Sequence, residues 1–381
     1  MKITLETAKL NELIDIAIRF VSKNATLPIL QNIYFKASID SLIIRATDME
    51  KYIEIEMPCV VGLEWTITVN AKTFSDIIKT IEEKNIEINV DPKSNIMTIK
   101  SAKDNFEINW IPSSEYVALP DIPRDNVISL DGVMFSNWIK KVEFAVTEKS
   151  FSPVLTWVLL KSKKESDWNK LIFVWSDSFR LAEQKINIWS ELQDFSLIIP
   201  KVTITDIEKI AEYGASNESE EIKIQFSENL ITFEIKVKDT KILATSLLIQ
   251  GNFPEYDREE IMPRNFNTKI LVDKNECEKA IKKIWILTRD INNFIQIETN
   301  KTEIIISSWK TDKWVWSTSI PAIIEGQDVT LWINWRYITD FTRIMSGSEV
   351  LFNIVDNQKP LIISEKNDSS YKYLVRPLLN N

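Results

Sequence analysis

The order of helical and alternating segments along the chain repeats three times. Proline and acidic residues interrupt the sequence at Leu119–Pro123 and at Phe253–Pro263, which divides the 381 residues into three parts of similar length. Repetition of whole supersecondary units restricts the fold to architectures built from several copies of one domain. A chain of this length is also too long for a single hydrophobic core. We therefore predict three domains, at residues 1–124, 125–256 and 257–381.

Each third contains the same plan twice, namely a strand, a helix and three further strands. In the first helix, Leu10, Leu13, Ile14 and Ala17 recur at the spacing of one helical face. Short alternating strands with hairpin spacing indicate antiparallel sheets. The predicted class is α+β, with two β-α-β-β-β units in each domain. The predicted helices are Thr7–Lys23, Ala71–Lys84, Gly132–Lys149, Lys201–Tyr213, Lys274–Arg289 and Trp335–Met345.

Two arrangements of such units are compatible with the repeat. The domains could be independent, with helices that cover separate sheets. Identical units tend instead to stack edge to edge and continue their sheets, which also hides the strand edges. The repeat favours this second arrangement.

Several short motifs occur in a fixed order over the whole chain. They are Leu27–Asn32, Ala46–Asp48, Pro153–Leu155, Ser176–Ala182, Gly251–Tyr256, Asn334–Tyr337, Asp356–Pro360 and Tyr371–Pro377. In this order the sequence resembles the bacterial DNA polymerase III β subunit family, the sliding clamps. The resemblance implies a DNA-clamp fold and a head-to-tail homodimer that forms a closed ring, with helices around a central hole.

The same resemblance implies a function without chemistry. The ring would encircle duplex DNA independently of its sequence and tether the polymerase, as a processivity factor without a cofactor. The implied partners are the polymerase III catalytic subunit, the clamp loader and other proteins that carry a clamp-binding motif.

The charge distribution is compatible with a DNA channel. The chain has 46 Lys/Arg and 55 Asp/Glu, whereas the six predicted helices hold 18 Lys/Arg and 13 Asp/Glu. Basic helices attract phosphates and an acidic exterior repels other DNA. Lysine forms the weak, interchangeable phosphate contacts that sliding requires. The candidate channel residues are Lys23, Asn24, Lys72, Lys79, Lys140, Lys149, Lys201, Lys209, Lys279, Lys282, Arg289 and Arg336.

The resemblance also implies a cleft for partner peptides between the second and third domains. Aliphatic walls suit apolar anchors, and a few polar groups can hold a peptide backbone. The residues at the corresponding positions are Leu155, Ser176, Ser178, Phe179, Arg180, Leu181, Pro254, Arg258, Asn334, Tyr337, Gln358, Pro360, Val375, Arg376, Pro377 and Leu378. Phe179, Ser178 and Arg376 depart from the usual family residues, so the peptide preference is expected to differ.

Composition argues against several other classes of protein. The chain has no histidine, and its two cysteines, Cys59 and Cys277, belong to no CxxC pair, so we expect neither a metal site nor a disulfide. No run of 18 apolar residues predicts a membrane span, and the N-terminus has no apolar signal core, so we expect a cytoplasmic protein.

Two alternative functions remain open at this point. Asp48 and Asp177 occupy equivalent places in two repeats, but a DNA-processing enzyme needs clustered carboxylates around metal ions. A repeat-built interaction scaffold without a DNA role is the second alternative.

Tryptophan is abundant where glycine would be expected. The chain has 13 Trp and 6 Gly, and Trp65, Trp110, Trp157, Trp309, Trp314, Trp316 and Trp335 occupy positions where the family favours small turn residues. We hypothesise that the gene comes from a lineage that reads UGA as glycine. The tryptophans should then be exposed or force positive φ. The alternative is a lineage in which UGA codons for tryptophan have spread by drift.

Overall fold

The computed structural model describes residues 2–22, 27–91, 93–122, 126–143, 157–165, 168–177, 179–188, 192–219, 221–288, 293–308 and 316–378. Within these ranges it contains six α-helices and 26 strands, in the predicted order. No helix in the described ranges has the length and apolar character needed to cross a membrane.

The first third begins with a strand and a helix and then repeats that plan. Its elements are β1 (Lys2–Glu6), α1 (Thr7–Ala17), η1 (Ile18–Phe20), η2 (Pro28–Gln31), β2 (Asn32–Ser38), β3 (Ser41–Thr47), β4 (Lys51–Pro58), β5 (Val60–Leu63), β6 (Trp65–Asn70), α2 (Ala71–Thr80), β7 (Asn85–Asp91), β8 (Ile96–Lys100), β9 (Asn105–Asn109), β10 (Ile111–Pro112) and η3 (Ser113–Glu115).

The other two thirds follow the same plan. The middle third contains β11 (Asn126–Asp131), α3 (Gly132–Glu143), β12 (Trp157–Glu165), β13 (Trp168–Ser176), β14 (Arg180–Ile188), β15 (Ser196–Pro200), α4 (Lys201–Ser216), β16 (Glu221–Phe226), β17 (Leu230–Val237) and β18 (Thr240–Leu247). The last third contains β19 (Thr268–Asp273), α5 (Lys274–Thr288), β20 (Phe294–Asn300), β21 (Glu303–Ser308), β22 (Ser317–Gly326), β23 (Thr330–Asn334), α6 (Trp335–Ile344), β24 (Glu349–Ile354), β25 (Leu361–Glu365) and β26 (Tyr371–Val375). The predicted pair of β-α-β-β-β units per third is therefore confirmed.

The helix ends differ from the prediction at several places. Helix α1 ends at Ala17 because the chain tightens into the 3-10 turn η1. The predicted part of the third helix after Glu143 lies outside the described residues. Helix α4 continues to Ser216, and the N–H of Asn217 still donates to the carbonyl of Tyr213 at 3.2 Å. Helix starts are better specified by local chemistry: Asn70 Oδ1 accepts the N–H of Thr73 at 3.0 Å and so caps α2.

The two halves of each third exchange their first strands. The order β5-β1-β7-β8-β9 places β1 beside the strands of the second half, and β6 in turn pairs with β2. The middle and last thirds repeat this exchange through β11 and β15 and through β19 and β23. Neither half of a third can therefore complete its sheet alone.

The sheets also continue across the boundaries between thirds. Strand β4 pairs antiparallel with β18, and β14 pairs antiparallel with β26. By packing, the chain separates into two compact units, residues 1–137 with 202–250 and residues 138–201 with 251–381. Each unit thus contains one such junction, and the middle third is shared between the two units.

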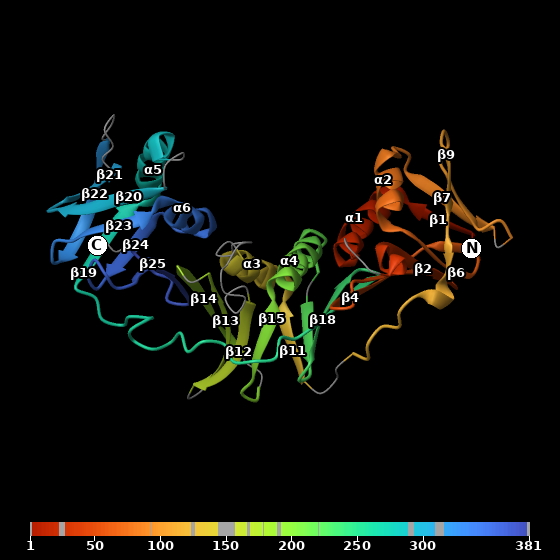
Figure 1. The fold of residues 1–381 in the computed structure, drawn as a ribbon, viewed down its shortest axis with the longest axis horizontal. Coiled ribbons are helices and arrows are strands. Elements are labelled where there is room, and N and C mark those ends of the chain that lie inside the picture. The colour runs from red at the N-terminus through yellow and green to blue at the C-terminus, as the bar shows by residue number, and fades with distance from the viewer. Residues whose placement is uncertain are drawn as a thin grey trace. The chain divides into compact units, whose positions relative to one another are not determined.

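Helices cover one face of the sheets within each unit (Figure 1). In the first unit, α1 and α2 lie side by side, and α1 buries Leu10, Leu13 and Ile14 completely. Phe35 of β2 and Phe74 of α2 pack with ring centroids 5.0 Å apart. In the second unit, Phe341 of α6 stacks on Tyr371 and Tyr373 of β26.

Candidate functional site

A tight turn between β13 and β14 organises the predicted cleft. Asp177 Oδ1 accepts the N–H groups of Phe179 at 3.0 Å and Arg180 at 2.9 Å. This aspartate-centred turn is a local alternative to a backbone turn. The turn leaves the Phe179 side chain 60% exposed and directs Arg180 inwards.

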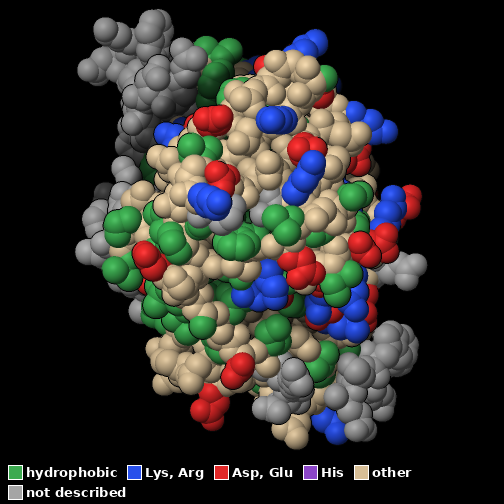
Figure 2. Space-filling view, turned by 90° about the vertical axis from the view of Figure 1, so that its right-hand side faces the viewer, with side chains coloured by type: hydrophobic (Ala, Val, Ile, Leu, Met, Phe, Trp, Pro, Cys, Tyr) green, Lys and Arg blue, Asp and Glu red, His purple; other side chains and the backbone are tan. Residues whose placement is uncertain are grey.

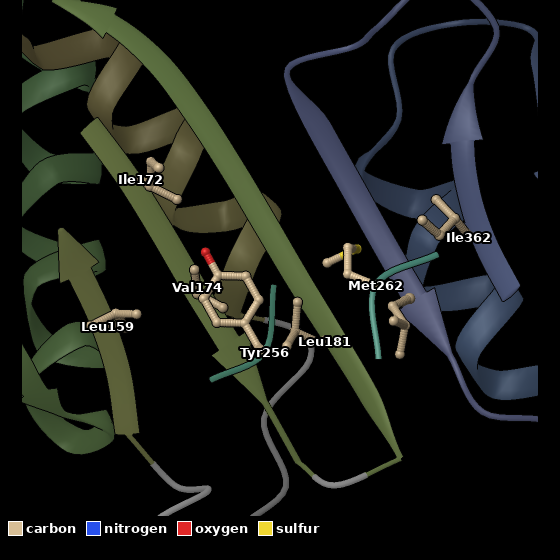
Figure 3. Close-up of a cluster of buried hydrophobic side chains, with 8 residues drawn as sticks. Leu159, Ile172, Val174, Leu181, Tyr256, Met262 and Ile362 are labelled. Carbon is tan, nitrogen blue, oxygen red and sulfur yellow. The ribbon is translucent and has the colours of Figure 1, made fainter. Parts of the chain in front are cut away.

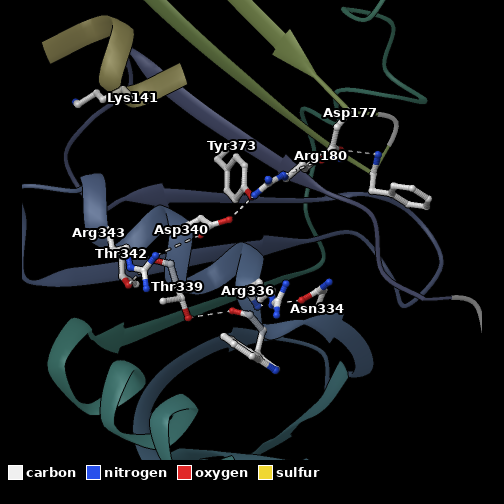
Figure 4. A network of polar contacts seen from close by, with 12 residues as sticks. Lys141, Asp177, Arg180, Asn334, Arg336, Thr339, Asp340, Thr342, Arg343 and Tyr373 are labelled. Atoms are coloured by element: carbon white, nitrogen blue, oxygen red, sulfur yellow. Dashed lines mark hydrogen bonds and ion pairs between the residues drawn. The ribbon is translucent and has the colours of Figure 1, made fainter. Parts of the chain in front are cut away.

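Arg180 is the centre of a buried polar network (Figure 4). Its Nε donates to Asp177 Oδ2 at 2.9 Å, and its Nη1 donates to Asp340 Oδ2 at 2.6 Å and to the hydroxyl of Tyr373 at 3.2 Å. The guanidinium also lies 4.7 Å from the ring centroid of Tyr337. Arg180 was predicted as a cleft residue, but only 5% of its side chain is exposed. It therefore holds the strand β14 to the helix α6 and does not present its charge to a ligand.

An apolar cluster packs beneath the turn (Figure 3). Its members come from β12, β13, β14, β25, β26 and the segment after β18; they are Leu159, Ile172, Val174, Leu181, Tyr256, Met262, Ile362 and Leu374. The Tyr256 hydroxyl donates to Glu183 Oε2 at 2.8 Å. Burial, together with the Glu183 carboxylate, raises the pKa of Tyr256 far above its usual range. This apolar cluster is closed to water. It can therefore support a peptide-binding surface from below, but it supplies no titrating group to that surface.

The predicted cleft residues divide by exposure into a rim, whose side chains are exposed or partly exposed, and a floor, whose side chains are buried. The exposed ones are Phe179, Pro254, Arg258, Gln358 and Arg376, and the partly exposed ones are Asn334, Tyr337, Pro360 and Leu378. The buried ones are Ser176, Arg180, Leu181, Val375 and Pro377. Leu155 and Ser178 lie outside the described residues. The backbone brings two rim residues together directly, because the N–H of Arg376 donates to the carbonyl of Phe179 at 2.8 Å.

Most predicted channel residues lie on or next to helices. Lys72, Lys279, Lys282 and Arg336 are exposed, as is Lys79, whereas Lys140, Lys201 and Lys209 are half-buried. Three of these cations already have acidic partners. Lys79 pairs with Asp15 at 2.7 Å, Lys209 with Glu212 at 2.9 Å and Lys279 with Glu276 at 2.8 Å. Lys23, Asn24, Lys149 and Arg289 lie outside the described residues.

The observed helices carry a smaller basic surplus than the predicted ones. Over the six α-helices as the structure bounds them there are 13 Lys/Arg and 10 Asp/Glu. Part of the difference arises because Arg19 lies in the 3-10 turn η1 and Lys84 follows the end of α2 at Thr80. The other three basic residues, Lys23, Lys149 and Arg289, lie outside the described residues. The electrostatic potential near the helices therefore depends more on single exposed lysine and arginine side chains than on the net charge of each helix.

The first unit contains a charged hollow that the sequence did not predict. It has a volume of about 1020 Å³ and lies between α1 and α4, with acidic and basic side chains mixed in its wall. At its base, Lys51 Nζ contacts Asp206 Oδ2, and both side chains are more than nine-tenths buried. Burial raises the pKa of Asp206, although Lys51 and Arg19 oppose that shift. The sequence contained one signal for the residues at the base of this hollow. Asp48 and Asp177 occupy equivalent places in two repeats, and each precedes a strand whose first residue is a cation.

The acidic and cysteine side chains of the described residues are not clustered. The described residues contain no group of three or more His, Cys, Asp or Glu side chains that could hold a metal ion. Asp48 and Asp177 each accept backbone N–H groups within their own turns. Burial raises the pKa of the Cys59 thiol to about 11 and that of Cys277 to about 12, so neither is an activated nucleophile.

The tryptophans do not behave uniformly. Trp65 is 39% exposed, as hypothesised, but Trp110, Trp175 and Trp335 are buried. No tryptophan among the described residues has positive φ, so Trp110 and Trp335 are neither exposed nor strained, and the expectation is wrong for these two. The indole N–H groups of Trp110, Trp175 and Trp335 are buried without an acceptor. Buried indole N–H groups normally donate to a hydrogen-bond acceptor. The unusual feature of these three tryptophans is therefore an unpaired polar atom in apolar surroundings.

Comparisons with known proteins cover the whole chain. Residues 1–120 match the N-terminal domain of the DNA polymerase III beta subunit, residues 129–255 its central domain and residues 259–379 its C-terminal domain. The chain is 26% identical over 390 residues to the beta sliding clamp of Bacillus subtilis, covering 99% of each chain. It is 27% identical over 374 residues to that of Staphylococcus aureus, covering 95% of this chain and 94% of the relative.

Solved structures agree with these matches. The crystal structure of the DNA polymerase sliding clamp from Bacillus subtilis superposes with a TM-score of 0.89 at 26% identity, covering 100% of both chains. The DNA polymerase III beta subunit from Thermotoga maritima has the same TM-score at 20% identity and full coverage, which supports the fold.

Proposed function

The chain belongs to the DNA polymerase III β subunit family, and from this premise we propose that it is a sliding clamp that encircles duplex DNA and tethers a DNA polymerase. It is a processivity factor and catalyses no reaction of its own. The observation that carries the proposal is the match to all three domains of the family, in order, over almost the entire chain.

A head-to-tail homodimer completes the ring in this proposal. The chain joins consecutive thirds twice by continuing a sheet, at β4–β18 and at β14–β26. A heterologous contact of this kind generates a closed ring when the rotation between copies closes. Two copies then supply six similar segments around the DNA.

The DNA contacts are proposed to be weak and directed to phosphates. Lys72, Lys282 and Arg336 are exposed cations on helices, and other candidates such as Lys79 are paired with acids. Phosphate contacts carry no sequence information, and lysine forms them without a fixed geometry. This combination supports movement along any sequence.

The partner cleft is proposed to lie around Phe179, Tyr337 and Arg376. A mobile segment of the polymerase III catalytic subunit, of the clamp loader or of another clamp-binding protein would place apolar anchors against Phe179 and Tyr337. The exposed Phe179 beside the buried Arg180 network is an aromatic anchor on a rigid support. Replication of DNA in a bacterial cell places these partners, and therefore this chain, in the cytoplasm.

Retention on circular DNA tests the proposal. The clamp is loaded on nicked circular DNA with a clamp loader, and the bound fraction is measured before and after linearisation. We expect retention on the circle and release from the linear form. Equal binding to both forms would instead identify a scaffold or a surface DNA binder.

Charge-reversal variants separate channel contacts from general electrostatics. Lys282→Glu and Arg336→Glu should lower retention at moderate salt. Lys236→Glu is the control, since Lys236 lies on β17 and its side chain is 65% exposed. An equal loss with the control would contradict a specific channel.

A further inference from the structure

One face of the sheet in the second unit gathers lysine side chains from adjacent strands. On β12, Lys161 and Lys163 are two residues apart and therefore project from the same face. Lys161 lies opposite Ile172 of β13, which in turn lies opposite Lys185 of β14. Because directly opposed residues share a face of a sheet, the three lysines lie on one face.

Two further cations extend this group. Lys372 of β26 lies opposite Glu183 of β14, and Glu183 is two residues from Lys185, so Lys372 projects from the same face. Arg264 follows in the segment after β18, where it donates to the carbonyl of Asp257 at 3.4 Å and acts electrostatically on Lys372. These five residues form the basic face: Lys161, Lys163, Lys185, Lys372 and Arg264.

The carboxylates that meet these cations among the described side chains offset them only in part. Glu183 is buried, accepts the hydroxyl of Tyr256 at 2.8 Å and pairs with Lys185 at 3.2 Å. Asp257 reaches Lys161 only at 3.9 Å, and its side chain is 59% exposed. The basic face therefore keeps a positive surplus in a chain that has 46 Lys/Arg and 55 Asp/Glu.

The cations of the basic face also repel one another. Burial lowers the pKa of Lys161; Asp257 and Glu183 oppose this shift, and the neighbouring Lys163 and Lys185 add to it. Burial lowers the pKa of the Lys372 ammonium as well, again with a contribution from Lys185. An anionic group bound among these side chains would relieve the repulsion, so the basic face favours a negatively charged partner.

Charges are mixed on other parts of the surface. Figure 2 views the side of the molecule that carries β9, where Asp and Glu side chains lie between the Lys and Arg side chains. On β16 and β17 of the first unit, Lys223 pairs with Glu221 at 3.4 Å and Lys236 with Glu234 at 3.6 Å. The concentration of cations on the basic face is therefore a local feature of the second unit.

The lysines of the basic face stand on a packed support. They share the face of the sheet that carries Leu159, Ile172 and Val174 of the apolar cluster (Figure 3). The Lys161 ammonium lies 4.6 Å from the ring centroid of Tyr256, which belongs to the same cluster. Packing of the lysine stem restricts its motion, which reduces the entropy that a bound partner would have to remove.

The spacing of these cations matches an extended acidic peptide. Lys161 and Lys163 are two residues apart on one strand, which is about 7 Å. Alternate residues of an extended peptide have the same period, so Asp or Glu at every second position would meet successive lysines. Single-stranded nucleic acid binds through stacking on exposed rings, whereas the Tyr256 ring is only 4% exposed. A peptide is therefore the better match.

The basic face is continuous with the proposed cleft. Strand β14 begins next to the rim residue Phe179, and Lys185 lies six positions further on, which is about 20 Å in an extended strand. Pro254 is also a rim residue, and Asp257, three positions later, reaches Lys161. One extended peptide can therefore contact both surfaces.

We propose that the basic face binds an acidic segment of a partner protein, namely the flank of the same peptide whose apolar anchors occupy the cleft. The flank would carry Asp or Glu at alternate positions, about six residues from those anchors. The inference rests on the proposed cleft and adds a second contact, which selects partners by the charge beside their anchors.

Matched peptides test this contact. A fluorescent clamp-binding peptide is extended at either end with alternating Glu and Ser, or with alternating Gln and Ser, and anisotropy gives its Kd for the full chain. We expect the Glu extension to bind roughly tenfold more tightly at about 50 mM salt, the sum of a few surface ion pairs. This gain should disappear near about 500 mM salt, because salt screens exposed charges.

Variants of the basic face locate the contact. Lys161→Gln with Lys185→Gln should abolish the gain and leave the Kd of the Gln-extended peptide unchanged. The matched control is Lys223→Gln with Lys236→Gln, two lysines of another sheet surface, and it should keep the gain. Lys163→Gln, at an exposed position, should reduce the gain about twofold without disturbing the packing. A gain that survives the first double variant, or that the control loses equally, would overturn the inference.

The outcomes separate this inference from the proposed function. Equal Kd values for the two extensions would overturn the basic face as a contact and leave the cleft intact. Failure of both peptides to bind would overturn the cleft and the basic face together. A single-stranded oligothymidylate that displaces the Glu-extended peptide more effectively than a free Glu-Ser peptide of equal charge would identify a nucleic-acid surface and overturn the choice of partner.

Discussion

The guanidinium of Arg180 lies 2.6 Å from the carboxylate of Asp340, so a strand of the middle third is bonded to a helix of the last third. Only 5% of the Arg180 side chain is exposed. Because an uncompensated buried charge is costly, this pair makes the relative position of β14 and α6 specific. Phe179, at the rim of the proposed cleft, belongs to the same turn as Arg180.

Removing Arg180 should destabilise the second unit. Arg180→Ala leaves Asp177 without its cation and Asp340 with only the exposed Arg343, and we expect a loss of about 3 kcal/mol in the free energy of unfolding. Arg343→Ala is the matched control, since Arg343 approaches Asp340 at 3.9 Å with its side chain 73% exposed, and it should cost less than about 0.5 kcal/mol. Urea denaturation of both variants measures the difference, and equal effects would contradict a structural role for Arg180.

The Lys51–Asp206 pair should show strong non-additivity. Lys51→Met alone leaves the buried Asp206 with only the 3.6 Å contact to Arg19 Nη1 and should cost about 3 kcal/mol. The double variant Lys51→Met with Asp206→Leu should recover most of this loss, because neither charge is then buried. A double-mutant cycle by chemical denaturation checks this, and additive losses would show that the two residues act independently.

Phe179 should contribute to peptide binding without contributing to stability. Phe179→Ala is expected to weaken binding of a clamp-binding peptide about tenfold, the loss of one aromatic anchor, while Tm remains unchanged. Val127→Ala, which removes a comparably exposed apolar side chain from β11, should leave binding unchanged. Titration calorimetry with both variants decides whether the rim is the binding site.

The Asp368 carboxyl should make the second unit sensitive to acid. Burial tends to raise its pKa, but hydrogen bonds from Ser370 and the nearby Lys141 outweigh burial and lower the pKa below the ordinary value of 3.8. A lowered folded pKa contributes stability above the unfolded value, and this stability is lost as pH falls through the folded pKa. We expect Asp368→Asn to flatten the dependence of Tm on pH below about 4. An identical slope in wild type and Asp368→Asn would contradict the assignment.

The three buried tryptophans with unpaired indoles should be glycine in the natural polypeptide. We expect peptide mass spectrometry of the protein from its own cells to read glycine at positions 110, 175 and 335, and the corresponding codons to be UGA. UGG codons, or tryptophan in those peptides, would refute recoding. The exposed Trp285, which lines a pocket with Trp335 between α5 and α6, should be examined in the same way before that pocket is assigned a ligand.

The repeat, the α+β class and the helix starts could be read from the sequence because they depend on local information. Periodic apolar residues specify the α1 face, and the Asn70 side chain caps α2 through contacts within three residues. The helix ends were less accurate, since whether α1 stops at Ala17 depends on the 3-10 turn that follows. The motifs around Asp177 and Asn334 indicated the cleft, but they did not distinguish the exposed Phe179 from the buried Arg180.

The amino-acid sequence by itself therefore determined the β-α-β-β-β unit and its repetition, because secondary-structure propensity and hydrophobic periodicity act over a few residues. Only the tertiary structure decided which charges meet. Lys51 and Asp206 are separated by 155 positions and Arg180 and Asp340 by 160, and no local pattern connects residues so far apart. Sheet continuation brings each pair together.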